Sequence, residues 1–260
     1  MKKYEFTGEV KLCFGRTLRR IRATIAFGDV SVGNLGGWIE KEENLVHDGN
    51  AWVYGNAQVY GNAQVYGNAG VYGNAQVYGN ARVYGNAQVY GNARVYDNAW
   101  VCGNARVYGN AQVCGNAQVC GNAQVYGNAR VCDDAQVCDD AQVCDNARVY
   151  DNAQVYGNAQ VCDDARVYGN ARVYGNARVC DDARVSKQEH WLCVGPVGSR
   201  NDFTTFFRTK STEIFVKCGC FRGSIEAFEA KVKVSHGDSN HAKAYFAAIE
   251  LAKARITMED

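Results

Sequence analysis

The chain has 260 residues and a formal net charge of +1 at pH 7, with 28 Lys and Arg against 27 Asp and Glu. Such a balance gives no electrostatic bias toward nucleic acid or membranes, so neither is a favoured partner. No stretch reaches the ~18 apolar residues of a membrane span, and Met1–Tyr4 opens no apolar signal segment. We therefore expect a soluble protein that acts in the cytosol.

Residues 1–44 are predicted to form an N-terminal β cap. Two strands are expected, Tyr4–Leu12 and Thr17–Ala26, and a Gly-rich stretch from Phe27 to Trp38 follows them. A cap is needed because the end of a β-solenoid exposes unpaired backbone groups.

From Ala51 onward one hexapeptide recurs twenty-three times: Ala, a polar residue, Val, Tyr or Cys, Gly or Asp, and Asn or Asp. Side chains alternate between the two faces of a strand, so Ala and Val share one face. Gln and Arg at the polar position do not suit a narrow dry core, so Ala and Val should lie inside. Gly, Asn and Asp tolerate a left-handed backbone conformation and should form the corner. Three hexapeptides then close a triangular coil of about 18 residues.

The repeat resembles the hexapeptide of the left-handed parallel β-helix, in which an aliphatic residue precedes a small one by four positions, as Val53 precedes Ala57. The Gly36–Lys41 segment also resembles the lead-in of Asn-Ala-x-Val repeat solenoids of bacteria and phages. The resemblance implies a mostly β protein, with a solenoid over residues 45–186 between the N-terminal cap and a small C-terminal α+β domain. It also suggests a phage or mobile-element factor that captures a host molecule or defence protein.

Eight of the twelve cysteines take the Tyr position of the repeat. One-for-one replacement at multiples of six residues is typical of drift from Tyr and not of a disulfide framework, so free thiols are expected. These columns contain no His, and no metal site is predicted.

Grouping the repeat by 18 residues places like side chains in columns along the shaft. One column ends in stacked arginines, whose repulsion must be relieved either by an acidic partner or polyanion or by the Asp residues of adjacent corners. These surface candidates are Arg130, Arg148, Arg166 and Arg184. Stacked tyrosines stabilise a parallel ladder, and an outward aromatic patch also favours self-association, so a homo-oligomer is expected. The tyrosine candidates are Tyr60, Tyr78 and Tyr96.

Residues 187–260 lose the repeat and are predicted to form the α+β recognition domain. Strands are expected over His190–Val197, Thr204–Arg208 and Glu213–Lys217, with one helix from Ser224 to about residue 234 and another over Asn240–Ile256.

A pocket for a phosphate-bearing, nucleotide-like ligand is the functional interpretation of this domain. The turn at Gly198–Asn201 offers donors suited to an anion, and Cys218–Gly223 is placed at a strand-to-helix junction, where the helix dipole favours negative charge. The alternative interpretation is that these residues are core, turn and solvated positions. The ligand-binding candidates are Ser199, Arg200, Asn201, Thr204, Arg208, Lys210, Cys220, Arg222 and His236.

The favoured function is therefore a non-enzymatic binding protein, without a cofactor or catalytic residue, in which a rigid solenoid presents a recognition domain to an anionic small molecule or a host protein. An acyltransferase is the enzyme alternative, because many hexapeptide-repeat proteins have that activity, but the array has no His after His47 and no interrupting loop. A polymer-forming structural solenoid is the third possibility, which a domain on one end should block.

Overall fold

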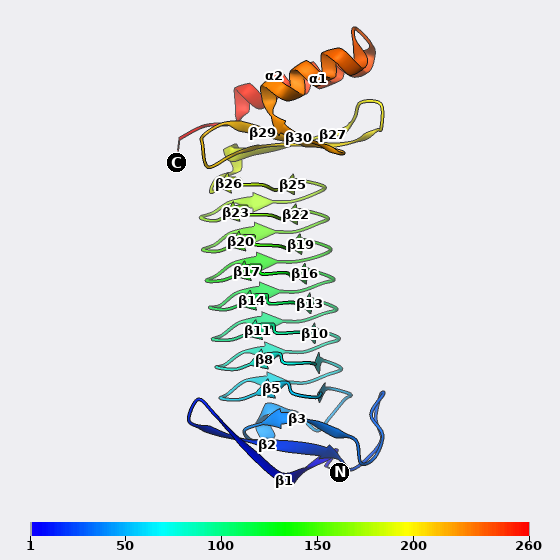
Figure 1. Ribbon diagram of the computed structural model, residues 1–260, viewed down its shortest axis with the longest axis vertical. Helices are drawn as coiled ribbons and strands as arrows, with labels where there is room; N and C mark the ends of the chain where they lie inside the picture. Colours follow the sequence, from blue (N-terminus) through cyan, green and yellow to red (C-terminus); the bar gives the residue numbers. More distant parts are fainter. Residues whose placement is uncertain (1, 260) are drawn as a thin grey trace.

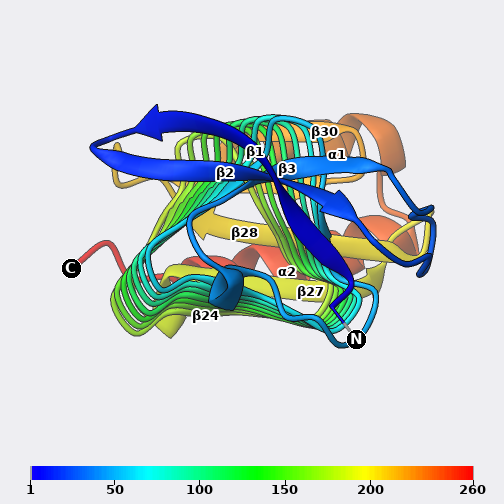
Figure 2. The same cartoon turned by 90° about the horizontal axis from the view of Figure 1, so that it is seen from below.

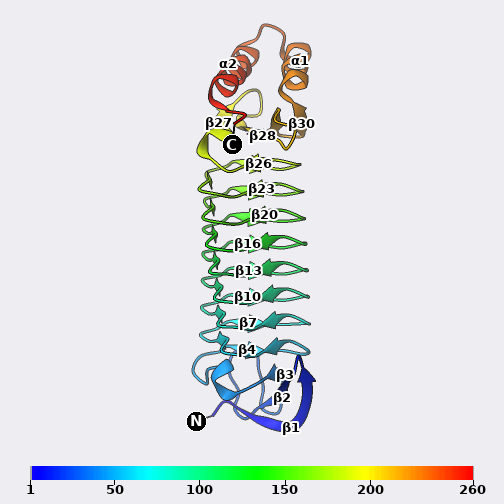
Figure 3. The ribbon, with the colours of Figure 1, turned by 90° about the vertical axis from the view of Figure 1, so that its left-hand side faces the viewer.

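The computed structural model describes residues 2–259, which form a rod with three parts. A β cap closes the N-terminal end, the repeat forms the shaft, and a domain with two helices covers the other end (Figures 1 and 3). The mostly β solenoid with about 18 residues per coil is confirmed, whereas the predicted left hand of the coil stays a prediction.

The shaft has three faces, and each hexapeptide contributes one two-residue strand to one of them. Each strand pairs in parallel with the strand 18 residues later, so Val59 pairs with Val77. The first face contains β5 (Gln58–Val59), β8 (Gln76–Val77), β11 (Arg94–Val95), β14 (Gln112–Val113), β17 (Arg130–Val131), β20 (Arg148–Val149), β23 (Arg166–Val167) and β26 (Arg184–Val185).

The other two faces repeat this arrangement. The second face contains β4 (Trp52–Val53), β7 (Gly70–Val71), β10 (Gln88–Val89), β13 (Arg106–Val107), β16 (Gln124–Val125), β19 (Gln142–Val143), β22 (Gln160–Val161) and β25 (Arg178–Val179). The third face contains β6 (Gln64–Val65), β9 (Arg82–Val83), β12 (Trp100–Val101), β15 (Gln118–Val119), β18 (Gln136–Val137), β21 (Gln154–Val155) and β24 (Arg172–Val173).

The shaft core consists of the repeated Ala and Val, as the alternation predicts. Every one of them from Ala51 to Val185 has 0% exposure. Each buried Val contributes on the order of 1.5–3 kcal/mol before conformational entropy is subtracted. The corners also follow the prediction, because the Gly and Asp at the fifth position of the repeat have positive φ, as Gly115 (67°) and Asp133 (59°) show.

Asparagine ladders join the corners of successive coils. The Nδ2 of Asn98 donates to Oδ1 of Asn116 (3.0 Å), and Nδ2 of Asn116 donates to Oδ1 of Asp134 (2.9 Å). The other two corners contain ladders that end in the same way, at Asp140 and Asp164. An ionised carboxylate can only accept, so an Asp at the end fixes the direction of every amide before it.

The N-terminal cap extends the sheet of the first face. It consists of β1 (Tyr4–Cys13), β2 (Arg16–Ala23), β3 (Leu35–Ile39) and a 3₁₀ turn, η1 (Glu42–Asn44). The β1–β2 hairpin is antiparallel and crosses the end of the shaft, while β3 pairs in parallel with β5 (Figure 2). The Lys3 ammonium donates to the carbonyl of Ala51 (2.8 Å), and this bond supplies a partner to a backbone group of the first coil.

The C-terminal domain has an antiparallel sheet of β27 (Trp191–Val197), β28 (Asp202–Arg208), β29 (Ile214–Cys218) and β30 (Phe221–Ser224), preceded by the 3₁₀ turn η2 (Gln188–His190). Helices α1 (Ile225–His236) and α2 (Asn240–Arg255) follow and pack on one face of this sheet. The predicted strands and helices are present, but β30 was not predicted. No helix in residues 2–259 combines the length and apolar character that crossing a membrane requires.

Side chains alternate between the two faces of β28, and one face of its sheet covers the core of the last coil. Phe207 packs into the shaft core, whereas Phe206 packs under the helices. The hydroxyl of Thr205 accepts the backbone N–H of Arg178 at 2.9 Å. The indole of Trp191 donates to the carbonyl of a shaft residue, Arg172, at 3.0 Å. The domain therefore supplies partners to backbone groups of the shaft that would otherwise be unpaired.

The expectation of free thiols throughout is wrong at one pair. Cys162 and Cys180 form a disulfide between successive coils, with Cα atoms 4.7 Å apart. Stacking at the spacing of neighbouring strands brings such side chains within bonding range, so a column of cysteines does not need a sequence framework to form a disulfide. The other described cysteines are free.

Candidate functional site: a pocket in the C-terminal domain

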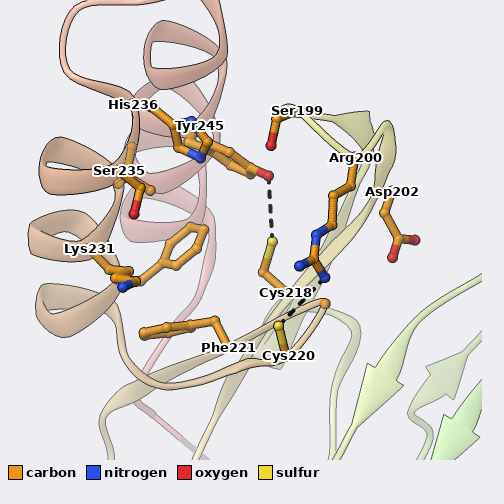
Figure 4. Close-up of a pocket in the computed structure, with 13 residues that line it drawn as sticks. Ser199, Arg200, Asp202, Cys218, Cys220, Phe221, Lys231, Ser235, His236 and Tyr245 are labelled. Atoms are coloured by element: carbon orange, nitrogen blue, oxygen red, sulfur yellow. Dashed lines mark hydrogen bonds between the residues drawn. The ribbon is translucent and has the colours of Figure 1, made fainter.

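A pocket of about 160 Å³ opens between the β27–β28 turn, the β29–β30 turn and the two helices (Figure 4). Residues from all four segments converge there, although they are up to 46 positions apart in the chain, from Ser199 to Tyr245. The pocket lies on the helix side of the sheet, away from the surface that covers the shaft.

One wall of the pocket is aromatic. The ring centroid of Phe228 lies 5.0 Å from that of Phe221 and 5.5 Å from that of Tyr245. The Tyr245 ring also lies directly against Gly198, where a Cβ atom would collide with the phenol. Gly198 has φ +74°, so its lack of a side chain serves both the turn and the close approach.

The phenol of Tyr245 meets the thiol of Cys218 at 3.8 Å. Burial, followed by this hydrogen bond, raises the pKa of Tyr245 to about 12. The hydroxyl therefore stays neutral near pH 7 and can donate a hydrogen bond to a ligand.

The mouth of the pocket carries cationic and titratable groups from different segments. Arg200 lies on the β27–β28 turn and donates from Nη1 to the sulfur of Cys220 at 3.5 Å. Lys231 and His236 reach the same pocket from α1, and Figure 4 shows them across the cavity from Arg200. Asp202 is the acidic lining residue, and its Oδ1 accepts the backbone N–H of Phe203 at 2.7 Å.

The structure brings together some of the predicted ligand-binding residues. Those that line the pocket are Ser199, Arg200, Cys220 and His236. Asn201 lies in the same turn with φ 51° but is not among the lining residues.

The other predicted residues do not line the pocket. Thr204 is buried, and its hydroxyl donates to the sulfur of Cys218 at 3.1 Å. Arg208 is also buried and donates to the carbonyl of Met258 at 3.1 Å. Lys210 faces the shaft arginines, and Arg222 pairs with Asp181 of the shaft.

The strand-to-helix junction predicted at Cys218–Gly223 contains an additional hairpin, and the helix starts just after it. These residues form the β29–β30 hairpin, with Cys218 opposite Phe221, and α1 begins only at Ile225. The first turn of that helix is capped by its own Ser224, whose hydroxyl accepts the N–H of Ala227. The first lining residue of α1 is Phe228, one turn after the helix begins, and a contribution of the helix dipole to ligand binding stays a prediction.

Sequence reasoning missed the contribution of the helices to the pocket. The lining residues it did not select include Phe228, Lys231, Ser235 and Tyr245. The first three lie at spacings of three and four on α1, which places them on one helical face, and this periodicity was the available signal. Tyr245 belongs to α2, and its ring is buried beside the cavity.

On the shaft, the predicted columns exist. Arg130, Arg148, Arg166 and Arg184 pair in register, one per coil, on the first face. Tyr60, Tyr78 and Tyr96 stack with ring centroids 5.0 Å apart. Tyr60 has only 6% exposure, so stacking and burial account for much of this tyrosine surface.

One group of possible metal ligands occurs among the described residues: Cys162, Asp163 and Cys180, whose ligand atoms lie within 4.8 Å of one another. The two sulfurs are joined in the disulfide, so they do not supply the thiolates that a soft metal ion prefers.

A family model described as YdcK Beta solenoid repeat matches the shaft at residues 75–87, 87–103, 99–115, 123–139, 141–157, 159–175 and 165–181. These matches support a β-solenoid repeat protein and do not reach the C-terminal domain. No curated protein matches the chain.

Proposed function

We propose that the protein is a non-enzymatic binding protein whose C-terminal domain takes a small anionic ligand with a planar ring. The observation that carries the proposal is the convergence of Arg200, Lys231 and His236 on a cavity with an aromatic wall. Arginine and lysine suit phosphate oxygens, and a ring stacks favourably on Phe221 or beside Tyr245.

The size of the pocket narrows the ligand class. Its volume of about 160 Å³ is below the ~300 Å³ at which drug-sized ligand sites begin. The cavity holds little more than the ring of the ligand, so a nucleoside monophosphate would place its base against the aromatic wall and its phosphate outside, at the open cationic mouth.

The enzyme alternative has less support. Cys218 and His236 both line the pocket, but the hydrogen bonds of the Cys218 sulfur within residues 2–259 are with Thr204 and Tyr245. A nucleophilic cysteine needs a base within hydrogen-bond reach, and a hydroxyl is not one. The shaft from residue 51 to 186 has no His to serve an acyltransferase.

Native mass spectrometry of the purified full chain is the first experiment. Extra mass that disappears on denaturation is the expected result, and its value begins to identify the ligand. The same spectrum counts subunits and so tests the predicted homo-oligomer. The cytosolic location and the phage or mobile-element origin stay predictions, and this test does not depend on them.

Titration calorimetry with adenosine 5′-monophosphate then tests the site. Arg200→Gln and Lys231→Gln should each weaken binding about tenfold, because each removes a charge-assisted bond. Lys243→Gln is the matched control, since Lys243 is an exposed lysine of α2 that does not line the pocket. An absence of both captured mass and millimolar binding would contradict the proposal, as would equal losses in the control.

A further inference from the structure

A groove on the first face of the shaft carries a continuous row of positive charge. It follows the last four coils beneath the C-terminal domain, where β17, β20, β23 and β26 are stacked (Figure 1). Its volume is about 570 Å³. We call it the arginine groove, and its cations are Arg130, Arg148, Arg166, Arg184 and Lys210.

The spacing of these charges is set by the backbone. Each arginine pairs in register with the next, as Arg148 does with Arg130 and Arg166. Neighbouring strands lie ~4.8 Å apart, so the four arginines repeat over roughly 14 Å of the shaft. Like charges directly opposite each other destabilise a sheet, so this row requires a counter-charge.

Corner carboxylates provide only part of that counter-charge. Asp164 accepts from the amide of Asn146 (3.2 Å), and Asp163 accepts the backbone N–H of Asp181 (3.2 Å). Asp181 itself pairs with Arg222. No ion pair within residues 2–259 includes an arginine of the groove. Asp164 and Asp182 line the groove beside its five cations, so a net charge of +3 remains.

Hydrogen bonds position two residues, Arg184 and Lys210, at the end of the groove nearest the C-terminal domain. Arg184 donates from Nη1 to the carbonyls of Asp182 (3.0 Å) and Ala183 (2.8 Å). Burial, followed by the charge of Arg166, lowers the pKa of Arg184, and the carboxylate of Asp182 acts in the opposite direction. The backbone N–H of Lys210 donates to the carbonyl of Asp182 (3.1 Å), and this bond fixes the fifth cation over the row.

We propose that the arginine groove binds a linear inorganic polyphosphate chain. Guanidinium groups match phosphate oxygens in bidentate geometry, and every phosphate unit of the chain carries a negative charge. Successive phosphates are closer together than the arginines, so each arginine can meet one, whereas an extended acidic peptide presents same-face carboxylates only every ~6.7 Å and leaves some arginines without a partner. The groove is separate from the pocket in the C-terminal domain, so this proposal does not rest on the proposed function.

Binding of fluorescently labelled inorganic polyphosphate to the full chain, measured by anisotropy, tests the proposal. Removing two adjacent charges with Arg148→Gln/Arg166→Gln should weaken binding at least about tenfold, and affinity should fall steeply with salt. Gln112 occupies this position one coil below Arg130, so the array tolerates the replacement.

The control is Arg106→Gln/Arg172→Gln, which removes the same charge from the same repeat position on the second and third faces. It should bind like the wild type. Three results would overturn the proposal: no binding by the wild type, equal loss in the control, or polyglutamate binding as tightly as polyphosphate. Circular dichroism of each variant verifies that the fold is retained.

Discussion

The shaft and the C-terminal domain build their surfaces in opposite ways. In the shaft, a core residue such as Val119 has the same strand partners as Val137 one coil later, because each pairs with a Val in the coil before and the coil after it. In the C-terminal domain, Arg200 and Tyr245 each have surroundings that no other residue shares. A binding site on the shaft must therefore be a column that spans several coils, whereas a site in the domain can depend on single side chains.

The largest expected effect tests the uniformity of the shaft. Val119→Asp buries a carboxylate in a core that offers no partner, so it should lower the free energy of unfolding by more than about 3 kcal/mol. Val137→Asp, one coil later, should cost the same within error. Denaturant titration measures both. Gln118→Asp, on the outer surface, is the control and should change stability by less than about 0.5 kcal/mol.

A disulfide breaks the uniformity of the cysteine column. In denaturant without reduction, alkylation should modify all but two of the twelve cysteines, leaving Cys162 and Cys180. Cys162→Ser should then cost about 2–3 kcal/mol, since the bond closes a short loop of chain. Mass spectrometry and thermal unfolding measure these two effects. Alkylation of every cysteine would show that the pair is reduced.

Two glycines of the C-terminal domain with positive φ, Gly198 and Gly237, should differ in the stability that each loses on substitution by Ala, because their surroundings differ. Gly198→Ala adds a clash with Tyr245 to the backbone strain and should cost about 2 kcal/mol and distort the pocket. Gly237→Ala adds a Cβ that meets nothing within 4 Å, so it should cost only about 1 kcal/mol. Thermal unfolding compares them. Equal losses would mean that the close approach to Tyr245 is unimportant.

The smallest expected loss of stability comes from breaking an asparagine ladder at one corner of the coils. Asn116→Ala removes two ladder hydrogen bonds, to Asn98 and Asp134, and should cost about 1 kcal/mol because both are exposed to water. Hydrogen exchange should show faster opening at that corner alone, since each coil contacts only its neighbours. A loss of protection along the whole shaft would contradict this local behaviour.

The shaft could be predicted because its information is local and repeated. Alternation placed Ala and Val inside, Gly and Asp supplied the positive φ of the corners, and a period of six residues closed the coil. The columns of Arg130 to Arg184 and of the tyrosines followed from counting by 18. No long-range choice was required, since each strand meets the same partner in the next coil.

Only the tertiary structure decided which residues of the C-terminal domain cover the last coil and which line the pocket. Alternation along β28 sends Thr205 and Phe207 toward the last coil and Thr204 and Arg208 under the helices, where both are buried and do not line the pocket. The turns that carry Arg200 and Cys220 meet Lys231 and Tyr245 only through helix packing. The sequence by itself determined the repeat, since its pairing is periodic; the pocket depended on contacts between distant segments that no local pattern specifies.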